Sequence, residues 1–599
     1  MVVPFFGTGQ PAEKACFSVP GGFYEESPVL EIFPFYQQHH IRFTTNGNRP
    51  TAQSRLYTEP LLLDGSFYSH SDIYTIPIAL PEYQYIPDSV RHCIVIRAAV
   101  FDENDSCISE VATHSYFIRS LGCDFLELPV VSLCADSLDL FDYERGILVP
   151  GVFFDPENPL STGNYYQTGR EWERLSNFEY YEQGVEPVNQ QAGIRTQGVK
   201  SRYFGQKGLK LYARAEYGKN RFEHRFFPSI PHNSFKHLSL KPFYATWNQT
   251  GINDYLCNLI AAPLNMETLA SRPVVLFLNG EYWGIYFLHE KPDERYLEDH
   301  LGMDPEQVTI LSGWKPEVDC GDSIQFLELM DWMRDADLTD PQAYAYADSK
   351  IDIDNFIDYY IFELFSENTD WPNKNVRCWQ QGNSKWRWIF FDGDASLCWM
   401  TFTAFDNAVY EGHETWPSSR RASLFFRKLL ANEGFRERFN NRFHELLDTT
   451  FGYARTSRFF EEIKAWLSPE IPYQAERFGK PVDFDDWTTN LGNTQWFLME
   501  RCNRILPVLE EFMHWSVPEL QESPFTLYPN PTDGKLYLVF DTDGHETKQV
   551  AVYDMLGRKV YASIETVVQG SNVHTLDLDL APGIYVLNID NVFVKFVKL

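Results

Sequence analysis

Residues 351–375 read IDIDNFIDYYIFELFSENTDWPNKN, and this stretch decides the fold of the central part of the chain. Its apolar residues recur at the three- and four-residue spacing of a helix with one buried face, and Asp352 or Asp354 can cap the start of that helix. Pro372 cannot continue the helix. Asp370 is therefore expected in a loop just beyond the helix C-terminus, where the helix dipole disfavours a carboxylate and no packing role is evident.

The residues that follow this loop, 376–392, alternate apolar and polar positions around a Gln-Gly-Asn-Ser turn, which predicts a β-hairpin. Asp392 and Asp394 stand at the end of the second strand, and Asn375 follows Asp370 by five residues. This order of a carboxylate, an asparagine, a hairpin and an acidic strand end repeats the order of parts in protein kinases. Phosphoryl transfer needs oxygen ligands for Mg²⁺ beside a carboxylate that orients the acceptor hydroxyl. We therefore predict Asp370 as the catalytic residue and the other three as metal ligands.

A basic segment precedes this region at residues 192–222, AGIRTQGVKSRYFGQKGLKLYARAEYGKNRF. Its strand carries Lys207, Lys210 and Arg214, a local excess of cations in a chain with a formal net charge of −32. Phosphate groups would supply the missing anions, and neighbouring carboxylates would do so equally well. The segment alone leaves both interpretations open.

The composition of the 599 residues sets the class of protein. Lys and Arg number 51 against 83 Asp and Glu, so the field of the chain repels nucleic-acid phosphates and excludes duplex nucleic acid as a natural partner. Hydrophobic residues make up 44% and aromatic residues 16%, which is too much apolar surface for a disordered polyanion. The length predicts roughly three or four folded units.

The chain carries no apolar run that approaches the ~18 residues of a membrane span, so we predict no transmembrane segment. Its first residues, MVVPFFGTGQ, lack the basic start and apolar run of a signal peptide, which is expected to lie upstream or to have been removed. The ten cysteines form no Cys-x-x-Cys pair, which excludes a cysteine zinc site, and no His-Glu-x-x-His occurs. We expect most cysteines to be buried thiols, with one or two disulfides.

Residues 1–122 contain short alternating runs separated by turn residues, which predicts a β-sandwich. The runs FSVPGGFYEESPVLEIF (17–33), IRFTTNGNRPTAQSRLY (41–57) and VIRAAVFDENDSCISEVATHSYFI (95–118) resemble the chitobiase C-terminal-like β-sandwich of secreted bacterial proteins. We interpret this unit as a spacer without a ligand.

Residues 516–599 form another β unit after the proline-bearing junction HWSVPELQESP (514–524), where we expect a cleavable linker. YPNPTDGKL, VYDMLGRKV, LAPGIYVL and the final lysines, Lys595 and Lys598, resemble the type IX secretion C-terminal sorting domain of Bacteroidetes. The resemblance implies that type IX machinery exports the chain across the outer membrane, so that it is secreted or held on the surface.

Residues 123–515 contain four long motifs that resemble the CotH family, the spore-coat kinase H proteins and their secreted relatives. The motifs begin with GREWERLSN, AGIRTQGVKSRYFG, SRPVVLFLNGEYWG and NTDWPNKNVRCWQ. The resemblance implies an α+β atypical protein-kinase-like fold that uses ATP with Mg²⁺ or Mn²⁺ to phosphorylate Ser or Thr of a protein. Its site residues carry over as follows: Lys207 on the phosphates, Glu290 as the ion-pair partner of the lysine, Asp370 and Asn375 in the D-W-P-x-x-N loop, and Asp392 with Asp394 as the D-x-D metal motif. Lys210, from the same basic strand as Lys207, is predicted to bind the cofactor as well.

The expected protein is thus multidomain, with a central kinase-like domain between two β-sandwich domains. The expected function is a secreted or surface protein kinase. The alternative is a catalytically silent adhesion or glycan-binding protein with a pseudokinase-like core, which export favours because ATP is scarce outside cells. A glycosidase pair of Glu363 and Asp370 is disfavoured, because a helical Glu363 need not point toward the loop.

Overall fold

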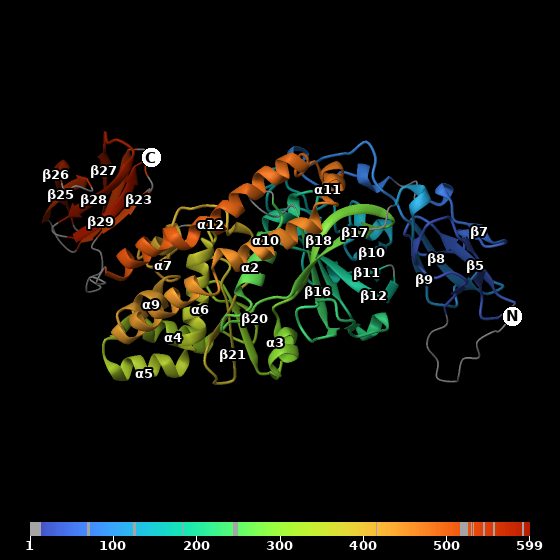
Figure 1. Ribbon diagram of the computed structural model, residues 1–599, viewed down its shortest axis with the longest axis horizontal. Helices are drawn as coiled ribbons and strands as arrows, with labels where there is room; N and C mark the ends of the chain where they lie inside the picture. Colours follow the sequence, from blue (N-terminus) through green and yellow to red (C-terminus); the bar gives the residue numbers. More distant parts are fainter. Residues whose placement is uncertain are drawn as a thin grey trace.

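The computed structural model describes residues 14–36, 38–68, 72–123, 127–183, 185–243, 250–414, 416–514, 525–528, 530, 532, 534–542, 546–554, 558–568, 570–589 and 592–598. The molecule is elongated, with a β-sandwich near the N-terminus at one end and the C-terminal strands at the other (Figure 1). The junction at 515–524, where we expect cleavage, lies outside the described residues. None of the described helices combines the length and apolar character of a membrane span.

The N-terminal unit is built from short strands around one apolar core. Its main sheet has the order β2-β9-β8-β5-β6, and the pairs β1-β4 and β3-β7 complete it. The strands are β1 (Cys16–Phe17), β2 (Gly22–Tyr24), β3 (Val29–Leu30), β4 (Ile32–Phe33), β5 (His40–Thr44), β6 (Arg55–Leu56), β7 (Leu61–Leu62), β8 (Ile94–Phe101) and β9 (Ala112–Ile118). Ile41, Phe43, Ile94 and Ile96 are buried between them, which confirms the alternating pattern read from the sequence.

A closed barrel follows, with the strand order β10-β11-β12-β13-β16-β18-β17. Its strands are β10 (Val130–Ala135), β11 (Arg174–Glu182), β12 (Val185–Gln197), β13 (Gly208–Tyr212), β16 (His237–Pro242), β17 (Ser271–Leu278) and β18 (Glu281–Glu290). Leu209, Leu211, Leu238, Leu240 and Leu288 belong to the core cluster of the barrel. Because side chains alternate along a strand, the residues between these leucines point to the opposite face.

Around the barrel lie short elements that connect its strands. They are α1 (Ser137–Phe141), the pair β14 (Phe222–Glu223) and β15 (Ser234–Phe235), α2 (Asn253–Ala261) and α3 (Glu294–Leu301). Helix α2 is almost entirely buried, and it stands between β16 and β17 in the chain.

The second half of the central region combines a four-stranded sheet with helices. The sheet has the order β20-β19-β21-β22. Its strands are β19 (Val308–Ser312), β20 (Glu317–Cys320), β21 (Arg377–Gln381) and β22 (Arg387–Ile389). The helices are α4 (Ile324–Asp335), α5 (Pro341–Lys350), α6 (Ile353–Ser366), α7 (Thr403–Ala408), α8 (Leu424–Leu430), α9 (Glu433–Asp448), α10 (Tyr453–Leu467), α11 (Ile471–Phe478) and α12 (Phe484–His514). The described residues thus mix helices and sheets, as expected for an α+β centre.

The C-terminal strands form two sheets around their own core, with the orders β23-β24-β27 and β26-β25-β28-β29. They are β23 (Phe525–Tyr528), β24 (Lys535–Thr542), β25 (Glu546–Asp554), β26 (Lys559–Val567), β27 (Gly570–Asp577), β28 (Gly583–Ile589) and β29 (Val592–Lys598). Leu536, Leu538, Val552 and Leu587 are buried in the core of this unit.

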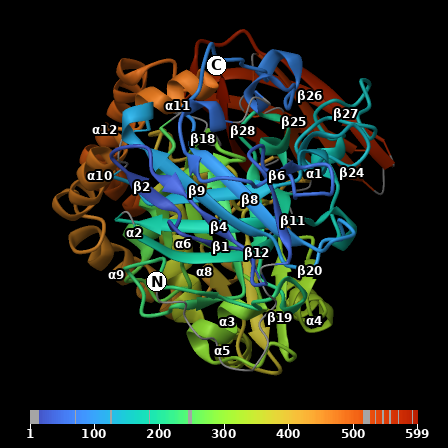
Figure 2. The same cartoon turned by 90° about the vertical axis from the view of Figure 1, so that its right-hand side faces the viewer.

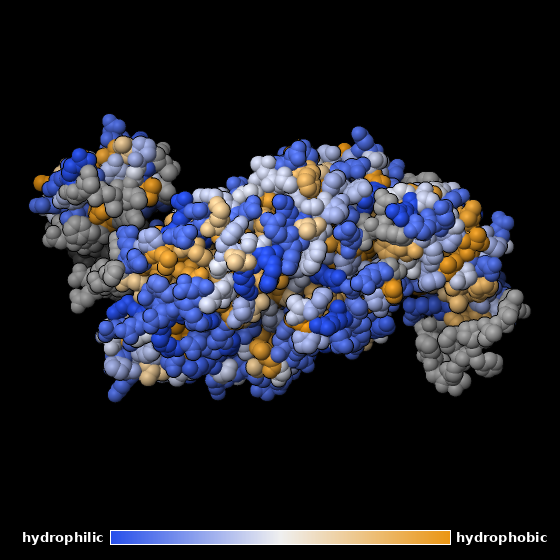
Figure 3. All heavy atoms as spheres, in the orientation of Figure 1, coloured by the Kyte–Doolittle hydropathy of each residue, from blue (hydrophilic) through white to orange (hydrophobic). Residues whose placement is uncertain are grey.

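The N-terminal sandwich packs against the barrel. Figure 2 shows β8 and β9 lying in front of β11 and β12, and backbone hydrogen bonds join Cys93 to Gly280 and Tyr282 to Arg91. The outer end of the sandwich presents an apolar patch in Figure 3. Val29, Phe33 and Leu62, on the short strands of this unit, are exposed apolar residues.

All ten cysteines are free, so the expectation of one or two disulfides is wrong. Five of them are buried thiols: Cys93, Cys123, Cys134, Cys257 and Cys378. Burial raises the pKa of the Cys378 thiol, which makes it a poor nucleophile for disulfide formation.

Candidate functional site

Helix α6 and its following loop hold Asp370 in place. Asp352 caps the helix by accepting the amide of Asn355 at 3.2 Å, and the helix ends in a left-handed residue, Glu367, with φ 53°. In the loop, the buried Trp371 indole donates to the Tyr359 hydroxyl at 3.1 Å. These contacts confirm the predicted helix and place Asp370 in a loop anchored on it.

The predicted hairpin is also present, as β21 and β22, and α6 holds it. Trp388 N donates to Asn355 Oδ1 at 2.6 Å, while Asn355 Nδ2 donates to Trp388 O at 3.1 Å. The strand end that carries Asp392 and Asp394 is therefore fixed to the helix whose following loop carries Asp370.

Asn375 and Asp392 lie together, and both have left-handed backbones, with φ 56° and 63°. Asn375 Nδ2 donates to the backbone carbonyl of Asp392 at 3.0 Å. Its amide nitrogen is thus engaged, and its amide oxygen is the atom that remains for a cation.

Gly393 holds the strand end that carries Asp392 and Asp394 close to helix α2. Its amide donates to Asp254 Oδ1 at 2.7 Å. A Cβ at this position would lie 2.8 Å from the Phe390 ring and 3.0 Å from Cys257 Cβ. Only glycine therefore lets the chain approach α2 this closely.

Lys241 connects the barrel to this acidic strand end. Its Nζ lies 2.6 Å from Asp392 Oδ1 and 3.0 Å from Asp254 Oδ2. Burial lowers the pKa of Lys241, but the charges of Asp254, Asp392 and Asp394 outweigh it and hold that pKa well above the usual value. The ammonium is therefore charged and faces three carboxylates.

Four carboxylates share this region. Burial and the charge of Asp392 raise the pKa of Asp394 well above its usual value, Asp254 and Asp370 add to that effect, and Lys241 opposes it. Carboxylate and amide oxygens are the ligands that Mg²⁺ and Mn²⁺ prefer. The residues present thus fit a divalent cation, which Asp392, Asp394 and Asn375 would hold.

Lys210 lies on the same face of the barrel as Lys241, within a group of basic residues. It pairs with Ser239, two residues before Lys241 on β16, so both lysines point to the same side. Burial, followed by the charges of Lys291, Arg202, Arg195 and Arg377, lowers the pKa of Lys210 to about 8. An anion beside Lys210 would relieve this repulsion.

Lys207 and Glu290 are placed differently from the sequence expectation. Lys207 is 1% exposed, its Nζ donates to the carbonyls of Ile78 and Phe204, and it lies 4.6 Å from the centre of the Tyr165 ring. The Lys207 ammonium is therefore bonded to backbone carbonyls, and Lys241 is the lysine that contacts the acidic strand end.

Glu290 forms no ion pair with either Lys207 or Lys241 among the described residues. It accepts the Ala270 amide at 2.9 Å and contacts His300 Nε2 at 2.6 Å. On β18 its neighbour His289 approaches Asp254 at 3.6 Å, and adjacent strand residues point to opposite faces. The carboxylates that contact Lys241 are Asp254 and Asp392.

Sequence reasoning missed Lys241 and Asp254. The alternation Leu-Ser-Leu-Lys at 238–241 is the signal that places Lys241 opposite the buried leucines. Asp254 sits in a helix that gives no comparable signal, because acidic residues are frequent in this chain.

Three family models match three parts of this chain. Residues 194–504 match the family model described as CotH kinase protein, residues 526–598 match the secretion system C-terminal sorting domain, and residues 30–116 match the model described as Fn3 associated. The first match covers just over half of the chain and includes every residue of the acidic strand end. No curated protein matches the chain. The sorting domain indicates secretion or an outer-membrane surface location through the type IX machinery.

Proposed function

We propose that this chain, which belongs to the CotH kinase protein family, transfers a phosphoryl group from ATP to a Ser or Thr hydroxyl of another protein. The observation that carries this proposal is the ion pairing of the Lys241 ammonium with both Asp254 and Asp392. In protein kinases a strand lysine pairs with a helix acid and holds phosphates beside the metal-binding aspartate.

The order of the parts supports a kinase-like fold. Lys241 lies on β16, Asp254 on the helix that follows, and two strands come next. Further along the chain come the Asp370 loop and the hairpin that ends at Asp392. Protein kinases have the same order, from the strand lysine through the helix acid to the catalytic loop and the metal-binding Asp. We propose domain boundaries of 1–122, 123–515 and 516–599 around this fold.

Each residue of the site has a distinct proposed role. Asp392, Asp394 and Asn375 hold Mg²⁺ or Mn²⁺, which when bound neutralises charge on the triphosphate. Lys241 contacts the phosphates, and Lys210 adds positive charge on the same face. Asp370 orients the acceptor hydroxyl and takes up its proton as the hydroxyl oxygen bonds to the γ-phosphorus of ATP, while the bond from that phosphorus to the bridging oxygen breaks and ADP leaves.

The sorting domain indicates where the chain would encounter its acceptor protein. A chain that is exported to the surface meets surface and secreted proteins, so we propose that the acceptor is one of these. Export also favours the second candidate, a catalytically silent adhesion or glycan-binding protein, because ATP is scarce outside cells.

The test uses the purified full chain with radiolabelled ATP, Mg²⁺ or Mn²⁺, and casein as a generic acceptor. We expect transfer by the wild type and none by Lys241→Met. Lys385→Met is the matched control, because Lys385 is exposed and contacts Asp348 at 3.3 Å, away from the acidic strand end. Absence of transfer by the wild type with either metal, together with absence of ATP binding, would overturn the kinase proposal and leave the silent candidate.

A further inference from the structure

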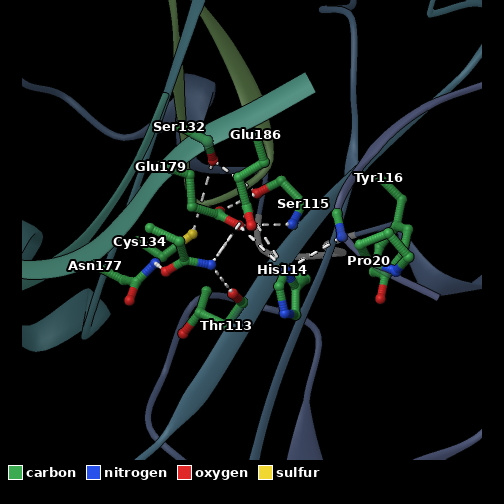
Figure 4. A network of polar contacts seen from close by, with 12 residues as sticks. Pro20, Thr113, His114, Ser115, Tyr116, Ser132, Cys134, Asn177, Glu179 and Glu186 are labelled. Carbon is green, nitrogen blue, oxygen red and sulfur yellow. Dashed lines mark hydrogen bonds and ion pairs between the residues drawn. The ribbon is translucent and has the colours of Figure 1, made fainter. Parts of the chain in front are cut away.

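A second group of ligating side chains lies where the N-terminal sandwich meets the barrel (Figure 4). It consists of His114 on β9, Glu179 on β11 and Glu186 on β12, each of which offers one atom within 4.8 Å of the others. His114 Nδ1 lies 3.4 Å from a carboxylate oxygen of Glu186 and 3.9 Å from one of Glu179. Three strands from two units therefore direct nitrogen and oxygen atoms at one point.

The charges of this group are not balanced within it. Glu179 is fully buried, and Glu186 and His114 are half-buried. Two carboxylates that face each other away from water repel strongly.

The hydrogen bond to His114 identifies the ring nitrogen that would meet a cation. The Gly21 amide donates to His114 Nδ1 at 3.2 Å, so this nitrogen carries a lone pair in that arrangement. The Glu186 oxygen lies 3.4 Å from the same Nδ1, so one cation between these two atoms would be within reach of both. A metal ion there would bond to both atoms and would take the place of the Gly21 proton on Nδ1.

The surrounding donors orient the carboxylates. Ser115 Oγ donates to Glu179 Oε2 at 2.6 Å, and the Ser115 amide donates to Oε1 at 3.1 Å, on the side of Glu179 that faces His114. The Tyr181 hydroxyl lies 2.9 Å from Glu179 and 3.0 Å from Glu186, and its single proton serves only one of them. Asn189 donates to Glu186 at 3.1 Å. Such outer contacts are typical of built metal sites.

We propose that His114, Glu179 and Glu186 bind one divalent transition-metal ion, Zn²⁺ or Mn²⁺, that joins the N-terminal sandwich to the barrel. Tetrahedral ligands at ~2.1 Å from Zn²⁺ lie roughly 3.4 Å apart, close to the separations in this group. One imidazole and two carboxylates suit these ions, and the double positive charge balances both carboxylates. The proposal does not depend on the kinase function, because the two sites share no residue.

The competing explanation is a proton. Glu179 can be protonated and bonded to Glu186, in which case the group needs no metal. Glu179→Gln separates the two explanations, because an amide imitates the protonated carboxyl but is a poor metal ligand. Glu182→Gln is the matched control, since Glu182 lies on the same strand and pairs with Arg272 outside the group.

The experiment uses the full chain with Asp392→Asn and Asp394→Asn in every sample, so that the acidic strand end takes up little metal. After treatment with EDTA, the chain is titrated with Zn²⁺ or Mn²⁺ alone, and bound metal is counted by mass spectrometry of the dialysed protein. We expect one ion per chain with native Glu179, and at least tenfold weaker binding in Glu179→Gln but not in Glu182→Gln. Equal binding by both variants, or no uptake of either ion, would overturn the proposal.

A spectroscopic readout keeps the test decisive if Glu179→Gln folds poorly. X-ray absorption of the Zn²⁺-loaded chain is expected to show one imidazole nitrogen with oxygen ligands, and His114→Gln is expected to remove the imidazole signal. A spectrum with several imidazoles or with sulfur would contradict the assignment.

Discussion

Lys241 and Asp392 lie 2.6 Å apart, although Lys241 is on a barrel strand and Asp392 ends a hairpin of the other half of the central region. Asp254 completes the contact at 3.0 Å from the same ammonium. One lysine thus bridges two carboxylates that separate elements supply. The position of either half relative to the other sets the geometry of the whole acidic site.

Lys241→Met is expected to remove this bridge. Because the charge-assisted contact to phosphate is lost, the Kd for ATP with Mg²⁺ should rise tenfold or more, which is about 1.4 kcal/mol. Calorimetric titration of the full chain measures the change.

Lys207→Met provides the contrast to Lys241→Met. It leaves the carbonyls of Ile78 and Phe204 without their donor, so it should lower the free energy of unfolding by about 1–3 kcal/mol. The folded fraction should keep the wild-type affinity for ATP. A selective loss of ATP binding by Lys207→Met with unchanged stability would return the phosphate role to Lys207.

Asp370→Asn is expected to separate catalysis from binding. The orienting carboxylate acts in the transition state, so kcat should fall by at least 10²-fold while the Kd for ATP stays close to that of the wild type. Asp392→Asn should weaken ATP binding as well, because it removes a metal ligand. An equal loss of ATP binding in both variants would contradict the separate role of Asp370.

Glu363 is expected to make stability depend on pH. Burial raises the pKa of Glu363 to about 8, although the side chains of Asn368 and Tyr359 favour its charged form. The folded state therefore holds a proton that the unfolded state releases near pH 4.5. The stabilisation is fully present below that pH and is lost as the pH rises toward 8, by up to about 1.4 kcal/mol per pH unit.

The variant Glu363→Gln should remove this loss. Denaturant unfolding at pH 5 and pH 8 should give a smaller difference for the variant than for the wild type. The same pH difference in both proteins would show that Glu363 is ionised in the folded state.

The sequence was sufficient for the local parts of the site. Helical spacing and the Pro372 stop predicted α6 and its loop, and period-two alternation predicted the hairpin, because both signals depend only on neighbouring residues. Asn375 Nδ2 reaches the backbone carbonyl of Asp392 because the hairpin folds the chain back on the loop.

The contacts between the barrel and the second half of the central region could not be predicted from the sequence in the same way. Whether Lys207 or Lys241 reaches the acidic strand end depends on strand register and on barrel closure, which no short window of sequence contains. Glu290 and His289 illustrate the point, because a shift of one residue along β18 exchanges the two faces. The junction of His114 with Glu179 likewise depends on how two units dock.

Gly393→Ala tests how strictly the acidic strand end must approach α2. The new Cβ would lie 2.8 Å from the Phe390 ring and 3.0 Å from Cys257 Cβ, and both neighbours are buried. The chain must then shift and weaken the Gly393 bond to Asp254, so we expect a loss of about 1–3 kcal/mol in unfolding free energy.

The same shift moves Asp392 and Asp394, so the folded variant should also bind ATP with Mg²⁺ more weakly. Gly492→Ala is the control, because no atom lies within 4 Å of its Cβ position on helix α12. That change should be neutral or should stabilise the chain by about 0.5–1 kcal/mol. Chemical denaturation and calorimetric titration of both variants measure the two effects, and wild-type stability in Gly393→Ala would show that the close approach to α2 is not required.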